Sequence, residues 1–400
     1  MKKNLLFVIP SLSAGGGEKS LVNLLSQIDY SQYDVDLFLL NHDGLFMEFL
    51  PEEVHVLSLP AAYKLFALPL VESIIQLVLT NRLSLIYSRM MFAFLNVFKK
   101  KISINEQYNW RYLAKSLECL NKQYDVAIGF LEKTSTYICV DKVSAVKKIG
   151  WIHTDYDKLG MDPGFDTEYF SKLDHIVTVS EECASILRKR FPNHKHKIEV
   201  IYNIVSPRTI NHMAVHWNMD IYERATNEII ILSIGRLNYE KDFAMALEAC
   251  KKLVKKGYNI RWNIIGEGEE REKLTNLIRI NRLEDHFKLL GLKANPYPYL
   301  QQADIYAQTS RFEGKSIAID EAKILNKPIV VTNFSTAKDQ IDNGLNGLIV
   351  EMNADAVADG IERLIKDKRL QGSLISNLSQ ESLGTEEEIH KLYALIGNKL

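Results

Sequence analysis

Two glutamates with seven residues between them frame the start of a predicted helix. Glu313 lies in a polar turn after the strand-like run Ala303–Thr309, and Glu321 lies about two turns into an apolar helical pattern that ends before Pro328. Because a helix start offers unpaired N–H groups and the positive end of the helix dipole, it is a natural seat for a phosphate. Glu321 is placed to accept hydrogen bonds from sugar hydroxyls. An acidic turn followed by one solvated glutamate explains the spacing equally well.

A pair of cations stands upstream of these glutamates. Arg236 and Lys241 follow the apolar run Ile231–Gly235, five residues apart. A guanidinium binds phosphate oxygens in a forked geometry, and an ammonium adds a compact second charge. When a reaction expels a phosphate or diphosphate, negative charge grows on the leaving group. The two cations, together with amides around Gly314–Ile317, are suited to stabilise that charge.

With these motifs the sequence resembles the family-4 retaining glycosyltransferases of GT-B fold, also called glycosyl transferases group 1. Further blocks agree in order along the chain. They are NIIGEGEEREKL (263–274), KLLGLKANPYPYLQQADIYAQTSRFEG (288–314), KPIVVTN (327–333) and DNGLNGLIVE (342–351).

The resemblance implies an α/β fold of two Rossmann-like, doubly wound domains that face a central cleft. Four hundred residues also exceed what one hydrophobic core usually supports. We expect an acceptor-binding domain in residues 1–205, joined by a C-terminal helix (380–400) that crosses back to it. Residues 206–379 are then the nucleotide-sugar-binding domain, and the polar stretch 206–228 is expected to be a linker.

A glycine loop, Gly15–Gly17, separates the first predicted strand, Lys3–Pro10, from a helix that begins near Glu18. Glycines let backbone N–H groups approach a ligand closely. A dinucleotide site is disfavoured because Ser20 stands where the third glycine of that fingerprint belongs. The resemblance implies that Gly16 and Gly17 touch the donor diphosphate, and a simple strand-to-helix turn is the alternative.

A predicted strand in KKIGWIHTDYDK (147–158) ends on His153. Ligands of open α/β sheets bind at the carboxyl ends of strands. The resemblance implies that His153 reaches the donor sugar or the acceptor, with Glu132 and Lys133 lining the same cleft. A satisfied structural histidine is the alternative.

The remaining site residues follow from the resemblance. It implies Glu313 on the donor sugar, Glu321 on the ribose, backbone near Gly291–Leu292 on the base, and Gly266 to Gly268 shaping the pocket. The expected catalytic residues are Glu313, His153, Arg236 and Lys241. The expected donor-binding residues are Gly16, Gly17, Arg236, Lys241, Gly266, Gly268, Leu292, Glu313, Gly314, Lys315, Ser316, Ile317 and Glu321.

Three residues, at two places, depart from the family pattern. Lys315-Ser316 replace an aromatic residue or leucine followed by proline, and Asp320 adds a carboxylate at a commonly apolar position. Lys315 either adds charge near the diphosphate or points to solvent. These departures leave the identity of the sugar open.

Composition narrows the function classes. The formal net charge of −1 gives no case for a nucleic-acid partner. The four cysteines, Cys119, Cys139, Cys183 and Cys250, lack metal-ligand spacing and are expected as buried thiols in a reducing cytoplasm. No DxD pair stands in a suitable strand–turn context, so we expect neither a metal nor a cofactor.

Residues 61–104 are the least typical segment. They are rich in Leu, Ile, Phe and Met, with Lys64, Arg82 and Arg89 interspersed and Lys99–Lys101 near the end. Such a region can lie in the interface of an anionic bilayer, although core helices explain most of the same residues. No stretch reaches eighteen uncharged apolar residues, so peripheral contact with the cytoplasmic face of the inner membrane is expected rather than a transmembrane helix.

The resemblance thus implies a metal-independent retaining glycosyltransferase of bacterial surface or capsular polysaccharide biosynthesis. It would move a hexose or N-acetylhexosamine from a UDP-linked nucleotide sugar to a lipid-linked saccharide acceptor. The mechanism that the family implies is front-face attack by the acceptor. A non-catalytic sugar-nucleotide-binding subunit is the main alternative, and an epimerase or dehydrogenase of Rossmann fold is the third.

Overall fold

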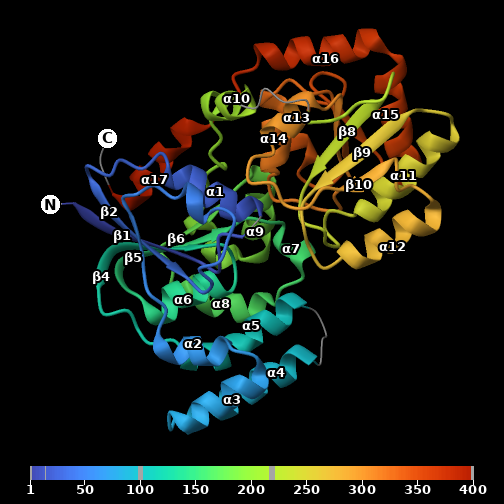
Figure 1. Cartoon of the computed structure of the whole chain (residues 1–400). Helices are drawn as coiled ribbons and strands as arrows, with labels where there is room; N and C mark the ends of the chain where they lie inside the picture. The colour runs from blue at the N-terminus through green and yellow to red at the C-terminus, as the bar shows by residue number, and fades with distance from the viewer. Residues whose placement is uncertain (1, 14, 98–101, 216–220, 398–400) are drawn as a thin grey trace. The chain divides into compact units, whose positions relative to one another are not determined.

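The computed structural model describes residues 2–13, 15–97, 102–215 and 221–397 (Figure 1). The chain divides into two compact units. The first comprises residues 1–13, 24–201 and 389–400, and the second comprises residues 14–23 and 202–388. The units differ from the expected ranges because 14–23, 202–205 and 380–388 group with the second unit.

The first unit is built on a parallel sheet of seven strands in the order β3-β2-β1-β4-β5-β6-β7. The strands are β1 (Lys3–Ile9), β2 (Tyr33–Leu39), β3 (Val54–Val56), β4 (Gln123–Phe130), β5 (Ser144–Ile152), β6 (His175–Thr178) and β7 (Ile198–Val200). Continuous apolar runs such as Leu5–Ile9 are wholly buried, as expected of strands covered by helices on both faces. The strand order reverses between β1 and β4.

Helices cover this sheet. They are α5 (Ile102–Leu113), α6 (Thr134–Lys142), α7 (Tyr156–Leu159), α8 (Pro163–Ser171), α9 (Glu181–Arg190) and α17 (Ile389–Ile396), with short 3-10 turns at Met47–Phe49, Ala114–Ser116 and Pro192–Lys197. The Ser180 hydroxyl caps α9 by accepting the Cys183 N–H at 3.2 Å. Tyr393 of α17 stacks on Tyr33 with ring centroids 5.2 Å apart. The C-terminal helix therefore belongs to the first unit, as expected.

Three helices, α2 (Ala61–Ala67), α3 (Leu70–Leu79) and α4 (Leu83–Val97), extend the first unit beyond its sheet (Figure 1). Their own core is small and is centred on Ala62, Leu77 and Leu85. The predicted basic run Lys99–Lys101 lies outside the described residues. In the part of the chain that the structure describes, no helix combines the length and apolarity that crossing a membrane requires.

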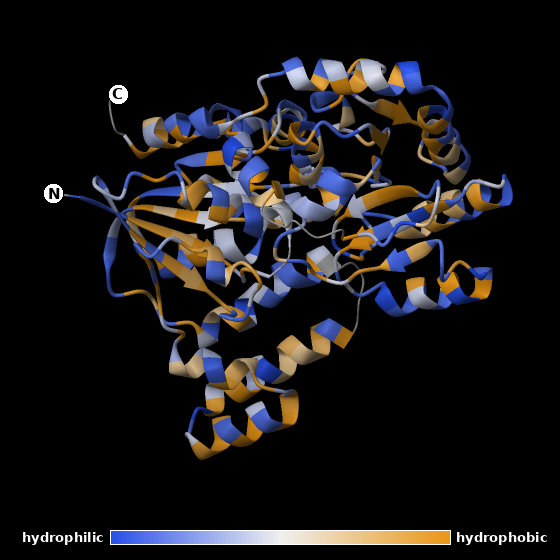
Figure 2. Cartoon of the chain, turned by 45° about the horizontal axis from the view of Figure 1, so that its top comes forward, coloured by the Kyte–Doolittle hydropathy of each residue, from blue (hydrophilic) through white to orange (hydrophobic). Residues whose placement is uncertain are grey.

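The second unit contains a parallel sheet of six strands in the order β10-β9-β8-β11-β12-β13. The strands are β8 (Ile229–Ile234), β9 (Ile260–Ile265), β10 (Phe287–Leu289), β11 (Ile305–Gln308), β12 (Ile329–Thr332) and β13 (Leu348–Val350). β8 pairs with both β9 and β11, so the strand order reverses between β8 and β11. Figure 2 shows the strands of both units as largely hydrophobic.

Helices pack on both faces of the second sheet and form two cores. One core involves α11 (Phe243–Lys255), α12 (Arg271–Asn281) and α15 (Ala354–Lys366), and the other involves α10 (Pro207–Val215), α13 (Tyr297–Gln302) and α14 (Ile317–Ile324). The unit also holds the first eight residues of α1 (Gly16–Leu25), together with α16 (Lys368–Gln380) and 3-10 turns at Ala337–Asp339 and Glu386–Glu388. This is the expected doubly wound arrangement.

The predicted linker at 206–228 is wrong over its first half. Residues 207–215 form α10, and Ile210 and Ala214 are buried in the second unit's core. Two apolar residues four positions apart put one face of this short helix inward, but polar neighbours hid that pattern in the sequence. Residues 216–220 lie outside the described residues.

Candidate functional site

The predicted donor residues gather where the strand order of the second sheet reverses. Arg236 and Lys241 lie in the turn between β8 and α11, and Glu313 lies in the turn between β11 and α14. Ligands of open α/β sheets bind outside the carboxyl ends of strands at such a point. The topology therefore brings the two motifs together, although more than seventy residues separate Arg236 from Glu313.

Glu313 is held by a dense set of hydrogen bonds. Its Oε1 atom pairs with Lys241 Nζ at 2.5 Å and also accepts from Ser310 Oγ at 2.5 Å and Gln308 Nε2 at 2.8 Å. Its Oε2 atom accepts no hydrogen bond from the described residues. The carboxylate is thus fixed through one oxygen while the other remains available to a ligand.

The turn that carries Arg236 is fixed by close backbone packing. A Cβ on Gly266 would lie 1.9 Å from the Gly235 carbonyl oxygen, and one on Gly268 would lie 2.3 Å from the Leu237 carbonyl oxygen. The Leu237 N–H also donates to the carbonyl of Glu267 at 2.9 Å. Positions 266 and 268 therefore require glycine, because any side chain there would clash with the turn that carries Arg236. The Arg236 side chain is 48% exposed, and its Nη2 lies 3.3 Å from Glu18 Oε1.

The start of α14 is less open than the sequence suggested. The Ser316 N–H donates to Gln340 Oε1 at 2.8 Å, and Gln340 Nε2 donates back to the Ser316 carbonyl at 2.8 Å and to Asp320 Oδ1 at 2.9 Å. The expectation that amides from Gly314 to Ile317 receive phosphate therefore fails for Ser316, whose amide a distant glutamine side chain already occupies. The Ile317 side chain is buried in the core, so only its backbone can face a donor.

Lys315 and Asp320, two of the three residues that depart from the family pattern, pair with each other. Lys315 Nζ lies 3.8 Å from Asp320 Oδ2 and 4.1 Å from the centroid of the Tyr202 ring. Burial raises the pKa of Asp320, while Lys315 and Gln340 act in the opposite direction. Of the two options that the sequence left for Lys315, pointing to solvent is wrong.

Glu321 is almost wholly enclosed, with 1% of its surface exposed. Its Oε1 atom accepts from Tyr297 Oη at 3.0 Å and forms an ion pair with Lys19 Nζ. Lys19 Nζ also lies 4.5 Å from the centroid of the Tyr297 ring. Neither Lys19 nor Tyr297 was expected in the site. The sequence offered only one weak signal, which is that Lys19 closely follows the glycine loop.

The remaining donor positions are mostly backbone. Gly291 adopts a φ of +72°, and the side chain of Leu292 beside it is exposed. Gly16 is the first residue of α1 and is exposed, with no atom within 4 Å of an added Cβ, and Gly17 follows it. Gly314 lies in the same turn as Glu313. Nothing in these positions contradicts their predicted roles, which stay predictions.

His153 belongs to the first unit and directly follows β5. Its ring lies 4.6 Å from that of Phe130 and 6.0 Å from that of Trp151. Its Nε2 atom is buried and has no hydrogen-bond partner among the described residues. Burial lowers the pKa of His153 to about 3, so the ring is neutral near pH 7. The unpartnered Nε2 atom does not fit the alternative of a satisfied structural histidine, and the functional role of His153 stays a prediction.

The turn that follows β4, at residues 131–133, has a strained backbone. Leu131 and Lys133 have φ values of 118° and 62°, which side chains other than glycine rarely adopt. Between them, Glu132 Oε2 accepts the His153 N–H at 3.1 Å. Burial raises the pKa of Glu132, with Lys133 acting in the opposite direction. Glu132 and His153 thus lie together at the carboxyl ends of neighbouring strands.

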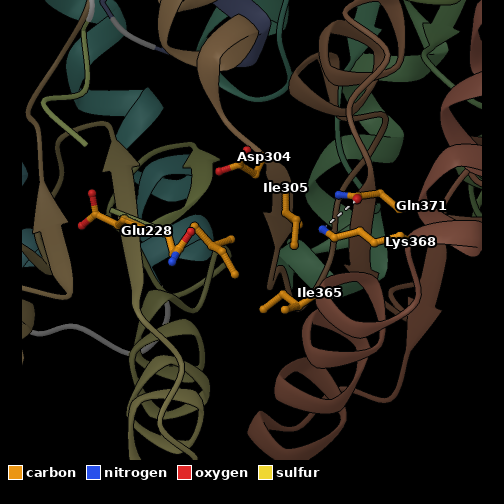
Figure 3. A pocket seen from close by; sticks show the side chains of 8 residues that line it. Glu228, Asp304, Ile305, Ile365, Lys368 and Gln371 are labelled. Carbon is orange, nitrogen blue, oxygen red and sulfur yellow. Dashed lines mark hydrogen bonds between the residues drawn. The ribbon is translucent and has the colours of Figure 1, made fainter. Parts of the chain in front are cut away.

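A separate cavity of about 320 Å³ lies elsewhere on the second unit (Figure 3). Its lining includes Glu228, Asp304 and Lys368, and Lys368 Nζ donates to Gln371 Oε1 at 3.1 Å. Because Glu228 and Asp304 immediately precede β8 and β11, this cavity is at the opposite end of the sheet from Arg236 and Glu313. It is not part of the candidate site.

The described residues contain no group of three or more His, Cys, Asp and Glu side chains placed to hold a metal ion. Metal independence remains a prediction about the reaction.

Comparison with known proteins gives a family match over the second unit. Residues 218–380 match the model of the family described as Glycosyl transferases group 1. This range includes Arg236, Lys241, Glu313 and Glu321.

Curated relatives are similar over part of the chain. One is the N-acetylgalactosamine-N,N'-diacetylbacillosaminyl-diphospho-undecaprenol 4-alpha-N-acetylgalactosaminyltransferase of Campylobacter jejuni, 29% identical over 50% of this chain and 53% of the relative. Another is the poly(ribitol-phosphate) alpha-N-acetylglucosaminyltransferase of Staphylococcus aureus, 24% identical over 61% of this chain and 50% of the relative. The chain spans about half the length of these two relatives.

Solved structures resemble nearly the whole chain. A glycosyltransferase from Rickettsia africae gives a TM-score of 0.70 at 18% identity and covers 99% of this chain and 98% of its own. Anabaena HepE in complex with UDP-glucose gives 0.67 at 16% identity, covering 98% and 99%. This likeness and the two parallel-sheet Rossmann-like units confirm the predicted fold class.

Proposed function

We propose that this chain, whose residues 218–380 match the model of the glycosyl transferases group 1, transfers a sugar from a nucleotide sugar to a saccharide acceptor. The observation that carries the proposal is the junction of the two motifs. Lys241 Nζ and Glu313 Oε1 are 2.5 Å apart where the strand order reverses, and Arg236 lies on the same turn as Lys241. Cations for a diphosphate and a carboxylate for a sugar hydroxyl thus share one site.

The proposed reaction uses these residues as follows. Arg236 and Lys241 hold the diphosphate and stabilise the negative charge that grows on it as the glycosidic bond breaks. Glu313 Oε2 accepts a hydrogen bond from a donor-sugar hydroxyl, while Oε1 stays on Lys241, Ser310 and Gln308. Since both Glu313 and Glu321 are committed to hydroxyls, neither is free to act as a covalent nucleophile. We therefore propose front-face transfer with retention and without a metal ion.

The donor and acceptor are proposed from relatives. HepE and a Staphylococcus aureus neighbour were solved with UDP-containing ligands, and the Campylobacter relative is named for a sugar carried on diphospho-undecaprenol. We propose a UDP-linked hexose or N-acetylhexosamine as donor and a lipid-linked saccharide of bacterial surface polysaccharide as acceptor. His153, neutral and with Nε2 unpartnered among the described residues, is proposed to hydrogen-bond a sugar hydroxyl.

The surface of α3 and α4 supports peripheral contact with a membrane. Across residues 61–104 six basic residues stand against one acidic residue, Glu72. Ten large apolar side chains of α3 and α4 are exposed: Leu70, Val71, Ile75, Val78, Leu79, Leu83, Tyr87, Met90, Phe94 and Val97. An exposed apolar face within a basic segment suits an anionic bilayer. We propose that these helices rest on the membrane that carries the acceptor.

A donor screen tests the proposal. Thermal shift and slow donor hydrolysis are measured with UDP-, GDP- and ADP-sugars, with and without EDTA, for wild type and Glu321→Ala. We expect one donor base to give both signals, EDTA to change neither, and the variant to lose them. Loss of both signals in EDTA, restored by a divalent cation, would contradict the metal-free site.

The same screen separates the two main functions. Binding of a nucleotide sugar without hydrolysis, and without transfer to any saccharide acceptor, would favour the non-catalytic subunit instead. A bound nicotinamide dinucleotide in the purified protein would favour a Rossmann oxidoreductase or epimerase.

A further inference from the structure

Lys19 and Glu321 form a buried ion pair between segments 302 residues apart in sequence. Lys19 lies in the first turns of α1, and residues 14–23 group with the second unit, which also contains α14 and Glu321. The side chains of Lys19 and Glu321 are 16% and 1% exposed. Tyr297 completes the cluster by donating to the same Glu321 oxygen.

A carboxylate this deeply buried requires a charge partner. Removing one member of a buried ion pair is strongly destabilising, because it leaves an uncompensated buried charge. Burial by itself lowers the pKa of Lys19, but the Glu321 carboxylate and Tyr297 outweigh burial, so the pKa is raised. Lys19 is therefore an ammonium ion across the physiological range, and it neutralises Glu321 without help from a ligand.

The geometry also leaves one Glu321 oxygen for recognition. Tyr297 and Lys19 both contact Oε1, whereas Oε2 accepts no hydrogen bond from the described residues. The neighbouring residue Glu18 contacts Arg236 at 3.3 Å, where the Arg236 side chain is 48% exposed and the Glu18 side chain 10%, and this pair does not involve Glu321. Lys19 is thus the residue of α1 that pairs with the Glu321 carboxylate and holds its Oε1 atom.

We propose that Lys19 is a positioning residue for nucleoside recognition, which fixes Glu321 through Oε1 so that Oε2 accepts a ribose hydroxyl. This inference rests on the proposed function, because it takes a nucleoside diphosphate as the ligand. It adds a requirement that the glutamate motif alone does not contain, namely a lysine supplied by the segment after the glycine loop.

The test compares two probes that differ only in the ribose. UDP and 2′,3′-dideoxy-UDP are titrated calorimetrically into wild type, Lys19→Met and Lys19→Arg. A carboxylate that binds a ligand hydroxyl discriminates against the probe that lacks it, so wild type should prefer UDP by at least 10-fold. Lys19→Met should lose most of this preference, with little change for the dideoxy probe, and Lys19→Arg should keep it.

Lys323→Met is the matched control. Lys323 lies in the same unit, is 11% exposed, pairs with Glu381 at 2.9 Å and donates to the Gln340 carbonyl at 3.1 Å, and among the described residues it forms no hydrogen bond or ion pair with Glu321. Its replacement should lower the thermal midpoint and leave the preference for UDP unchanged. A merely structural role for Lys19 would make the two methionine variants behave alike.

Stability measurements cover the case in which Lys19→Met does not fold. Lys19→Gln then replaces it, since its amide still donates to Glu321 but carries no charge. The double variant Lys19→Met/Glu321→Gln should be more stable than Lys19→Met alone, because it removes the unpaired carboxylate.

Three results would overturn the inference. One is an unchanged UDP preference in Lys19→Met or in its Gln substitute, and another is tighter UDP binding, which would make Lys19 a competitor of the ligand. The third is wild type that binds neither probe, which would overturn the proposed function as well. If wild type binds UDP but Lys19→Met keeps the preference for UDP, the inference fails while the proposed function stands.

Discussion

At the scale of single residues, the two glutamates of the site share one design. Each is held through Oε1 by a lysine and by neutral donors, and each leaves Oε2 without a hydrogen bond from the described residues. Such preorganisation orients a carboxylate before the ligand arrives and lowers the cost of ordering it on binding. The lysines differ in origin, since Lys241 belongs to the expected motif and Lys19 does not.

His153 permits a prediction about pH. The pKa of His153 in the folded protein is about 3, below the ordinary value near 6.5. As the pH falls below about 6.5 the unfolded chain binds a proton that the folded chain does not, so stability declines by about 1.4 kcal/mol per pH unit. Between about pH 6.5 and pH 5, wild type should therefore lose roughly 2 kcal/mol more than His153→Asn, measured by urea unfolding.

The exposed His212 gives the control for this experiment. His212→Asn shows what removal of an exposed histidine does to the stability curve. Glu132, whose side-chain Oε2 accepts the His153 backbone N–H, is present in all three proteins, so its own titration cancels in the comparison. Parallel curves for wild type and His153→Asn would show that the histidine takes up its proton in the folded state.

Residue types at strand ends were predictable, but their partners were not. Arg236, Lys241, Glu313 and His153 each follow an apolar run, and the topology explains why the first three meet. Lys19, Tyr297 and Gln340 could not be found in this way. Each acts through a contact with a distant segment, and an isolated Lys, Tyr or Gln carries no periodic or motif signal.

At the scale of elements, long apolar strands and amphipathic helices were predictable and short ones were not. The strands of both sheets coincide with continuous apolar runs, because strands covered on both faces contain few polar residues. α10 was missed because only Ile210 and Ala214 mark its buried face. Residues 61–97 read equally well as core or as interface, since periodicity does not tell what covers an apolar face.

The exposed face of α3 and α4 yields the prediction at this scale. Leu79→Glu and Phe94→Glu place charges on side chains that are 72% and 53% exposed, so folding should be little affected. Binding to vesicles of phosphatidylcholine with about one-third phosphatidylglycerol should weaken on the order of 10-fold for the pair, because apolar burial in the interface is lost. Co-sedimentation measures this binding.

Ile280→Glu serves as the matched control, since Ile280 is 73% exposed but lies on α12 of the second unit. This variant should bind the vesicles as wild type does. Equal binding by all the variants, or no binding by wild type, would mean that the α3–α4 face is not a membrane surface.

At the scale of the whole molecule, the chain combines two units that each have their own sheet and cores. The fold class was predictable because alternating strand and helix signals extend along most of the chain. The boundaries of the two units were less predictable from the sequence. Residues 14–23 lie between two strands of the first sheet in sequence, yet they group with the second unit through contacts such as the Lys19–Glu321 pair.

This division predicts how ligands protect the backbone. UDP should slow hydrogen exchange in the second unit, around Arg236–Lys241, Glu313 and α14, because ligand binding adds RT ln(1 + [L]/Kd) to the stability of what it contacts, about 2.7 kcal/mol at 100 Kd. It should leave β5 and His153 of the first unit unchanged. A complete nucleotide sugar should in addition protect the turns that hold Glu132 and His153, since the proposed role of His153 is on a sugar hydroxyl. Mass spectrometry of peptides from the intact chain distinguishes the two patterns. Protection of the first unit by UDP alone would place the nucleotide there, and identical patterns for UDP and the nucleotide sugar would remove His153 from the site.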